Sequence, residues 1–130
     1  MDAAASFAAW IAALNRPRDR AALEAAVAPD ARIERHDALD RGAPPPSPAE
    51  IFDGIDAIER WMHRLVRPVT FSLVGAPAAG PDDGSWTAEY ALAVETFTGG
   101  GLWIARLAAD GRLAYLSHRP FPLADQWLRP

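Results

Sequence analysis

The sequence predicts an α+β fold in which helices cover one face of a curved antiparallel sheet. In the first half of the chain, apolar residues recur at helical spacing; the second half holds four β-prone segments separated by turn residues. Helices packed on one face of such a sheet form a cone with a hollow interior. The chain has 130 residues, of which 50% are hydrophobic, so we expect a single domain over residues 1–130.

Three helices are predicted in the first half of the chain. A second helix is expected to begin at Pro17, because proline suits a first helical turn, and to stop at Pro29 and Asp30. The first helix covers residues 3–15 and the third covers residues 54–65. Their apolar stripes are Phe7, Trp10, Ile11 and Leu14 in the first helix, and Ile55, Ile58, Trp61, Met62 and Leu65 in the third.

A short charged strand is predicted at residues 31–37. If Ile33 faces the core, alternation carries Arg35 and Asp37 inward. Glu34 and His36 then face outward, and a register error of one residue would invert this assignment. The next residues, 39–50, are rich in proline, glycine and charge, so we expect an irregular loop that is either a plain connection or a lid.

The second half is organised around a hairpin at residues 99–120. Its arms are joined by Asp110 and Gly111, a pair that suits a type I′ turn because both central residues of that turn need positive φ. Residues 69–74 and 86–97 are predicted as two more strands, and residues 98–100 as a turn. The faces predicted by alternation hold Trp103, Ala105 and Leu107 in the first arm, and Leu116, His118 and Pro120 in the second.

Charge and composition argue against several kinds of partner. The formal net charge of −4 disfavours nucleic acid or an anionic membrane surface. Without cysteine the chain has no disulfide, no thiol nucleophile and no thiolate metal site. Asp2 precedes the short apolar N-terminal run, where a secretory signal would carry positive charge. We therefore expect a cytoplasmic protein with no membrane span.

The element order and several short motifs resemble the nuclear-transport-factor-two-like superfamily, and most of all its SnoaL-like and ketosteroid-isomerase-like branches. The motifs are ALNR after the first helix, PDARIE before the first strand, FDGIDAIERW at the third helix and DGRLAYL in the return strand. The resemblance spans nearly the whole chain and implies a cystatin-like α+β barrel with an internal pocket. It implies little about activity, because this fold hosts isomerases, cyclases, hydrolases and binding modules.

The resemblance also identifies the positions of a ketosteroid-isomerase-like catalytic set. A member of that branch would carry a tyrosine in the first helix, a general-base aspartate in the first strand and a protonated acid in a later strand. Here these positions hold Trp10, Arg35 and Trp103. Neither an indole nor a guanidinium can take a proton from a substrate carbon at neutral pH. Steroid isomerase activity is therefore not expected.

His118 is the candidate for acid–base chemistry, with Arg35 and Asp37 as the other candidate catalytic residues. An imidazole titrates near neutral pH, so it can give or take a proton. A buried Arg35 needs an anionic ligand or a carboxylate partner, and Asp37 or Glu89 could be that partner. The alternative is structural, with His118 donating to a backbone carbonyl and Arg35 forming an internal ion pair.

Large apolar side chains are the candidates for ligand binding. They could line a pocket suited to a flat or greasy molecule, or they could fill the core, as large aromatic residues at such spacings usually do. No His-x-His or HExxH spacing occurs, so we expect neither a metal site nor a cofactor. The candidates are Trp10, Trp61, Met62, Trp103 and Leu116.

Two kinds of function remain open. One is a SnoaL-like enzyme of isomerase, cyclase or hydrolase type, which binds a small apolar or carbonyl-bearing molecule and uses His118 as its acid or base. The other is a non-catalytic module for ligand binding or dimerisation. A homodimer is expected, because helices on one side of a sheet leave its other face open. Trp86, Tyr90 or Tyr115 could supply that face.

Overall fold

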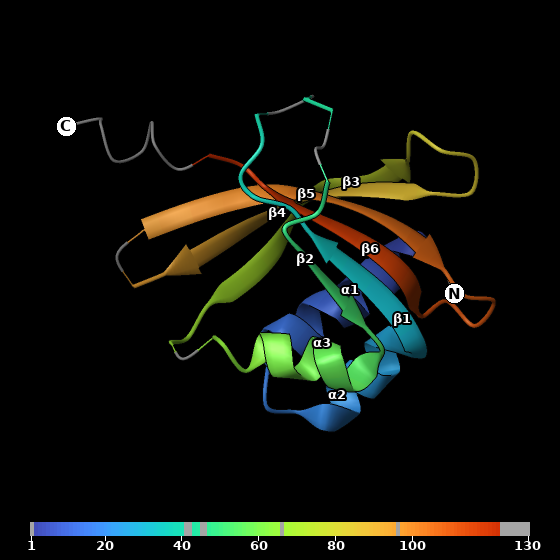
Figure 1. The fold of residues 1–130 in the computed structure, drawn as a ribbon, viewed down its shortest axis with the longest axis horizontal. Helices are drawn as coiled ribbons and strands as arrows, with labels where there is room; N and C mark the ends of the chain where they lie inside the picture. The colour runs from blue at the N-terminus through green and yellow to red at the C-terminus, as the bar shows by residue number, and fades with distance from the viewer. Residues whose placement is uncertain (1, 41–42, 45–46, 66, 96, 123–130) are drawn as a thin grey trace.

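The computed structural model of the chain describes residues 2–40, 43–44, 47–65, 67–95 and 97–122. All three helices lie in the first half of the chain and four strands make up the second half, as Figure 1 shows, so the predicted α+β fold is confirmed. The helices are α1 (Ala3–Leu14), α2 (Arg20–Ala26) and α3 (Ile55–Met62). The strands are β1 (Val27–Arg35), β2 (Glu50–Asp53), β3 (Thr70–Ala79), β4 (Trp86–Val94), β5 (Phe97–Leu107) and β6 (Leu113–Pro120).

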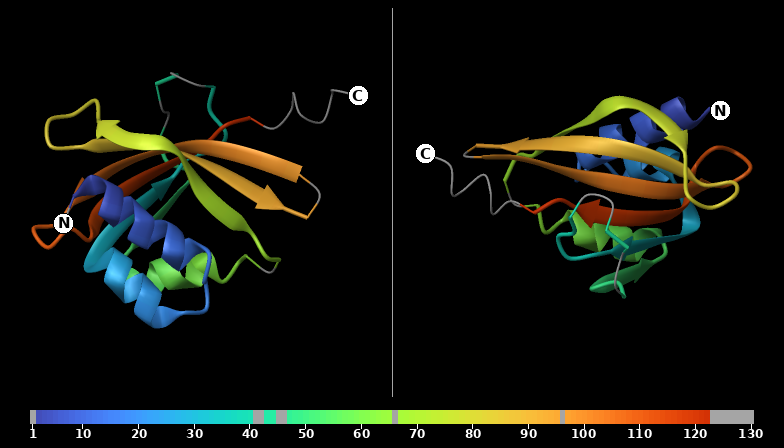
Figure 2. Two further views of the ribbon diagram at one scale, coloured as in Figure 1. Left: turned by 180° about the vertical axis from the view of Figure 1, so that it is seen from behind. Right: turned by 90° about the horizontal axis from the view of Figure 1, so that it is seen from above.

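The strands form one curved, unclosed sheet in the order β2-β1-β6-β5-β4-β3. Neighbouring strands run antiparallel, with the exception of β1 and β6, which run parallel. The helices lie on one face of the sheet, as Figure 1 and the left view of Figure 2 show. This is the predicted arrangement of a sheet curved around helices, with a concave side turned toward them.

The boundaries of α2 differ from the prediction. The helix begins at Arg20 because the carboxylate of Asp19 accepts a hydrogen bond from the backbone N–H of Ala22, as an N-cap does. Pro29 and the residue after it do not end the helix, since the chain is already extended at Val27. Both lie in β1, at a shift in its register with β6 that accommodates a residue without an N–H.

The strand β2 is absent from the prediction, which placed its first residue in the loop at 39–50. It pairs antiparallel with β1, from Arg35 opposite Glu50 to Arg32 opposite Asp53. Only four residues long and preceded by several prolines, it is too short to show a clear alternation. Residues 41–42 and 45–46 of the predicted loop lie outside the described residues, so its role as a lid stays a prediction.

The connection between β5 and β6 is longer than the predicted type I′ turn. Of its residues only Gly111 has a positive φ, 87°, and Asp110 does not. Two backbone bonds close the loop: the N–H of Gly111 donates to the carbonyl of Ala108, and the N–H of Ala108 donates to the carbonyl of Arg112. A five-residue connection of this kind needs one left-handed residue rather than two.

Glycines 99–101 lie inside β5 and pair with β4, and Gly101 pairs with β6 as well, so the predicted turn at 98–100 is wrong. Their role is close packing. A Cβ on Gly101 would clash with the phenol of Tyr90 and would stand 2.6 Å from the carbonyl oxygen of Arg119. A Cβ on Gly100 would stand 2.6 Å from the carbonyl oxygen of Tyr90. Glycine here lets the Tyr90 ring lie flat over the neighbouring strand.

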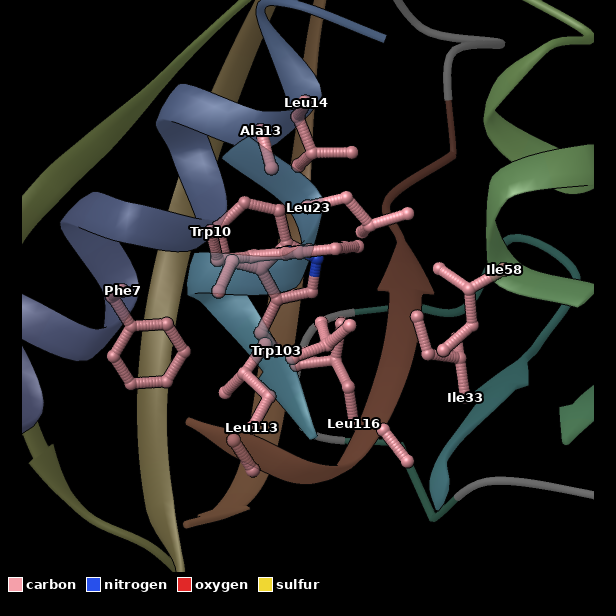
Figure 3. Close-up of a cluster of buried hydrophobic side chains, with 14 of the residues drawn as sticks. Phe7, Trp10, Ala13, Leu14, Leu23, Ile33, Ile58, Trp103, Leu113 and Leu116 are labelled. Carbon is pink, nitrogen blue, oxygen red and sulfur yellow. The ribbon is translucent and has the colours of Figure 1, made fainter. Parts of the chain in front are cut away.

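The core lies between the helices and the concave face of the sheet, with Trp103 at its centre (Figure 3). Trp103 is fully buried and stacks on Tyr90 with ring centroids 4.3 Å apart. Trp10 meets it edge-on at 6.3 Å, and Phe7 stacks on it at 6.3 Å. Each such aromatic pair contributes about 0.5–1.5 kcal/mol beyond the burial of its surface. Tyr90 is 1% exposed, so it cannot supply a dimer face. The homodimer itself stays a prediction.

The outward-facing side of β1 is covered at its end, which corrects the prediction that His36 is exposed. His36 is 3% exposed, and its backbone N–H donates to the carbonyl of His118. The N–H of Leu39 donates to the carbonyl of Pro120, so the chain after β1 follows the end of β6. Among the described residues, no helix is long and apolar enough to cross a membrane.

Candidate ligand-binding cavity

An apolar cavity of about 400 Å³ opens between the helices and the sheet. Its walls come from the end of α1, from α3 and the residues that follow it, and from β3, β4, β5 and β6. His118 and Arg64 are the polar members of its described lining, which contains no carboxylate. The apolar members include Leu14, Trp61, Met62, Leu65, Val69, Phe71 and Leu92.

Strand register places His118 between two predicted site residues. It stands opposite Arg35 of β1 on one side and opposite Trp103 of β5 on the other. Paired residues of adjacent strands point to the same face of a sheet, so the three side chains share the inner face. From the helix layer, Trp61 meets the imidazole edge-on with ring centroids 5.4 Å apart, and it stacks on Phe52 at 5.2 Å.

Trp103 fixes the tautomer of His118. The indole Nε1–H can only donate, and it lies 2.9 Å from Nδ1 of His118. Nδ1 is therefore an acceptor without a proton, and the neutral ring carries its proton on Nε2. The hydroxyl oxygen of Tyr90 lies 3.3 Å from Nε2 and accepts this N–H over a long distance. The neutral imidazole thus has a weakly held donor that an acceptor in the cavity can share.

His118 holds no proton beyond this one at neutral pH. Burial, together with the charges of Arg35 and His36, lowers the pKa of His118 from 6.5 to about 3. Burial also raises the pKa of Tyr90 well above its ordinary range, so its phenol stays protonated. Since the cationic form of His118 is disfavoured, its side chain is suited to donating a hydrogen bond and poorly suited to taking a proton from a substrate.

Arg35 is held by an internal ion pair whose partner was not predicted. Its Nε lies 2.9 Å from Oε1 of Glu50 in β2. Arg64 makes two further bonds of 2.9 Å to the two carboxylate oxygens of Glu50. Hydrogen bonds from Arg64 and Arg35 lower the pKa of Glu50 from 4.5 to about 2, so this carboxylate stays ionised at neutral pH.

Of the two carboxylates predicted as partners of Arg35, Asp37 forms a longer, exposed ion pair with it. Asp37 is 3.6 Å from Arg35, but its side chain is 82% exposed and does not line the cavity. Glu89 alternates with the buried residues Ala88 and Tyr90, which places it on the opposite face of the sheet. Glu50 was missed because it belongs to the one strand that the sequence pattern does not reveal.

The predicted ligand-binding residues divide into two groups. Trp61 and Met62 line the cavity together with His118. Trp10, Trp103 and Leu116 are fully buried in the core and are not among the cavity's lining residues. Lining residues that the sequence analysis missed include Leu92, which shares the inner face of β4 with Tyr90 by alternation. Among the described residues, no group of three or more His, Asp or Glu could hold a metal ion.

The fold is shared with many solved structures. A candidate isomerase of the SnoaL-like family from Agrobacterium tumefaciens is 18% identical and superposes with a TM-score of 0.68, over 91% of this chain and 96% of that one. A nuclear-transport-factor-two-like protein of unknown function from Exiguobacterium sp. 255-15 is 17% identical, with a TM-score of 0.65 over 88% and 97%. A computationally designed 17-OHP binder is 16% identical, with a TM-score of 0.64 over 94% and 92%.

These similarities concern the fold. The chain has the nuclear-transport-factor-two-like fold, as its SnoaL-like and ketosteroid-isomerase-like structural neighbours show. Neither the family models nor the curated proteins match the sequence. Proteins of one fold can carry unrelated activities, so the function has to be argued from the cavity.

Proposed function

We propose that the protein binds a small apolar molecule in the cavity between α3 and the sheet, and that a carbonyl or similar acceptor on this molecule takes a hydrogen bond from His118. The observation that carries the proposal is the cavity itself: about 400 Å³, open and almost wholly apolar. Cavities of this size and lining bind compact ligands by burying apolar surface, and a few polar groups orient them.

The cavity supports binding better than acid–base catalysis. Taking a proton from carbon requires a base whose pKa lies near the operating pH, and the environment of His118 depresses its pKa far below that. The described lining contains no carboxylate that could replace it. Glu50 is not among the lining residues, and it forms an ion pair with Arg64. A neutral imidazole can still polarise a carbonyl by donating a hydrogen bond. Isomerase, cyclase or hydrolase chemistry would need a base from outside this lining.

The test uses indan-1-one and indane, which share one skeleton and differ in the carbonyl group. Both should bind saturably and raise the free energy of unfolding, by about 1.4 kcal/mol at ten times the dissociation constant. The ketone should bind more tightly, because it alone can accept the N–H of His118. Thermal unfolding and tryptophan fluorescence report the binding, since Trp61 lines the cavity.

Two tryptophan substitutions on opposite faces of the sheet locate the site. Leu92→Trp fills the cavity and should abolish binding of both probes. Val74→Trp is the matched control, because Val74 is 49% exposed on the outer face, and it should bind both probes as the unmodified chain does. Circular dichroism checks that each variant folds. The proposal is wrong if neither probe binds the unmodified chain, or if the two variants bind equally well.

A further inference from the structure

A second, smaller cavity adjoins the apolar one and has a different lining. It measures about 210 Å³ and shares three wall residues with the first, Leu14, Leu65 and Val69. The two cavities therefore adjoin at three aliphatic side chains. A molecule longer than a compact bicycle would have to pass these side chains to extend from the first cavity into the second.

Arg67 is the ionisable residue in the described lining of this second cavity. It is exposed, and it forms no ion pair or hydrogen bond with any other described residue. Arg64 differs, because both of its terminal bonds go to Glu50. The side-chain amide of Asn15, which also lines this cavity, donates to the backbone carbonyl of Phe71 and accepts from its N–H. The charge of Arg67 is therefore the one in this described lining that remains available to a ligand.

A third cavity also reaches Arg67 but suits an anion less well. It measures about 320 Å³, shares Val94 with the apolar cavity, and is lined by Glu95 as well as Arg67. A carboxylate placed there would be repelled by Glu95, whereas the second cavity has no acidic residue in its described lining. The favoured position for negative charge is the second cavity.

We propose that the ligand is an amphiphilic carboxylate, whose apolar body occupies the first cavity and whose carboxylate lies in the second, paired with Arg67. This inference rests on the proposed binding function and adds a ligand class to it. A guanidinium recognises a carboxylate with two parallel hydrogen bonds, which an alcohol cannot accept and an ammonium group opposes. Arg67 in the second cavity therefore selects for the anion, and the apolar lining of the first cavity supplies most of the binding free energy.

Three probes with one alkyl chain test the inference by calorimetry: octanoate, octan-1-ol and octylamine, which is cationic at neutral pH. Octanoate should bind the unmodified chain about three- to fivefold more tightly than octanol, as expected for a partly exposed ion pair. Octylamine should bind more weakly than both. The preference for octanoate should shrink as sodium chloride is added, because salt screens exposed charges.

The variant Arg67→Gln should lose the preference for octanoate over octanol. Arg60→Gln is the matched control: Arg60 is an exposed arginine of α3 that lines none of the three cavities, and its loss should leave the preference unchanged. Equal binding of octanoate and octanol by the unmodified chain would overturn the carboxylate inference while leaving the binding function in place. A preference that survives in Arg67→Gln would overturn the role of Arg67. If none of the three probes binds, the proposed function itself fails.

Discussion

Lowering the pH from 6.5 should reduce the free energy of unfolding through His118, at pH values where the carboxylates are still ionised. The folded-state pKa of His118 is lowered from 6.5 to about 3, so between these values the unfolded chain binds a proton that the folded chain does not. The free energy of unfolding therefore falls as pH falls through this window, and the stabilisation is fully present only above pH 6.5. Between pH 6 and pH 4 the loss due to His118 should be about 2.5 kcal/mol.

The physical reason is visible in the hydrogen bonds of the ring. A proton on Nδ1 would face the indole N–H of Trp103, which lies 2.9 Å away and cannot accept it. The charged ring would also stand beside the guanidinium of Arg35. Protonation of this half-buried ring thus removes one hydrogen bond and adds a repulsion.

Urea unfolding at a series of pH values, with and without His118, measures the effect. The variant His118→Asn keeps an acceptor near the position of Nδ1 but does not titrate. Between pH 6 and pH 4 the unmodified chain should lose about 2.5 kcal/mol more than the variant. Glu50, whose pKa is lowered from 4.5 to about 2, loses its contribution at lower pH and does so in both proteins. Parallel curves for the two proteins, or an NMR titration of His118 near its ordinary pKa, would refute the reasoning.

Two further predictions concern single contacts of the sheet. Asn15→Ala should lower the free energy of unfolding by about 1–3 kcal/mol, because its amide both donates to and accepts from the backbone of Phe71. Asn15→Asp should not restore this stability at neutral pH, since its second carboxylate oxygen would face the Phe71 carbonyl and cannot donate to it. A cost of Asn15→Ala below about 0.5 kcal/mol in urea unfolding would contradict the assignment. Gly101→Ala should cost about 1–3 kcal/mol through overpacking against Tyr90. Adding Tyr90→Phe should recover part of that cost, and purely additive losses would show that the two residues do not collide.

Regular patterns in the sequence predict the fold well. The spacing of Phe7 and Trp10 identifies the buried face of α1, and alternation places Ile33 and Trp103 correctly in the core. Alternation also sets His118 opposite a large inner-face residue of the next strand. These predictions succeed because burying one apolar face supplies most of the stabilisation of each helix or strand, and this requirement sets the spacing of apolar residues in the sequence.

Features that depend on a distant partner were not predictable. Alternation does not reveal that His36 is buried, or that the chain after β1 follows β6. The glycines of β5 are typical of a turn in isolation, and only the position of Tyr90 shows why a strand needs them. The closer ion-pair partner of Arg35 is Glu50, whose strand pairs over four residues and leaves too short a pattern to detect.

The parallel pairing of β1 with β6 has a consequence for the synthesis of the chain. It joins Val27 to Leu113 and Arg35 to His118, across most of the length of the polypeptide. During synthesis both N-terminal helices are therefore translated long before β6. Until β6 is made, the Trp10 indole lacks part of the sheet that buries it in the folded protein. Pairing between segments so far apart in the sequence forms slowly, and apolar faces that are exposed in the meantime make the chain prone to aggregation. The β1–β6 pairing therefore cannot form before β6 has been translated, and until then the apolar faces of α1 and α2 lack part of the sheet that buries them.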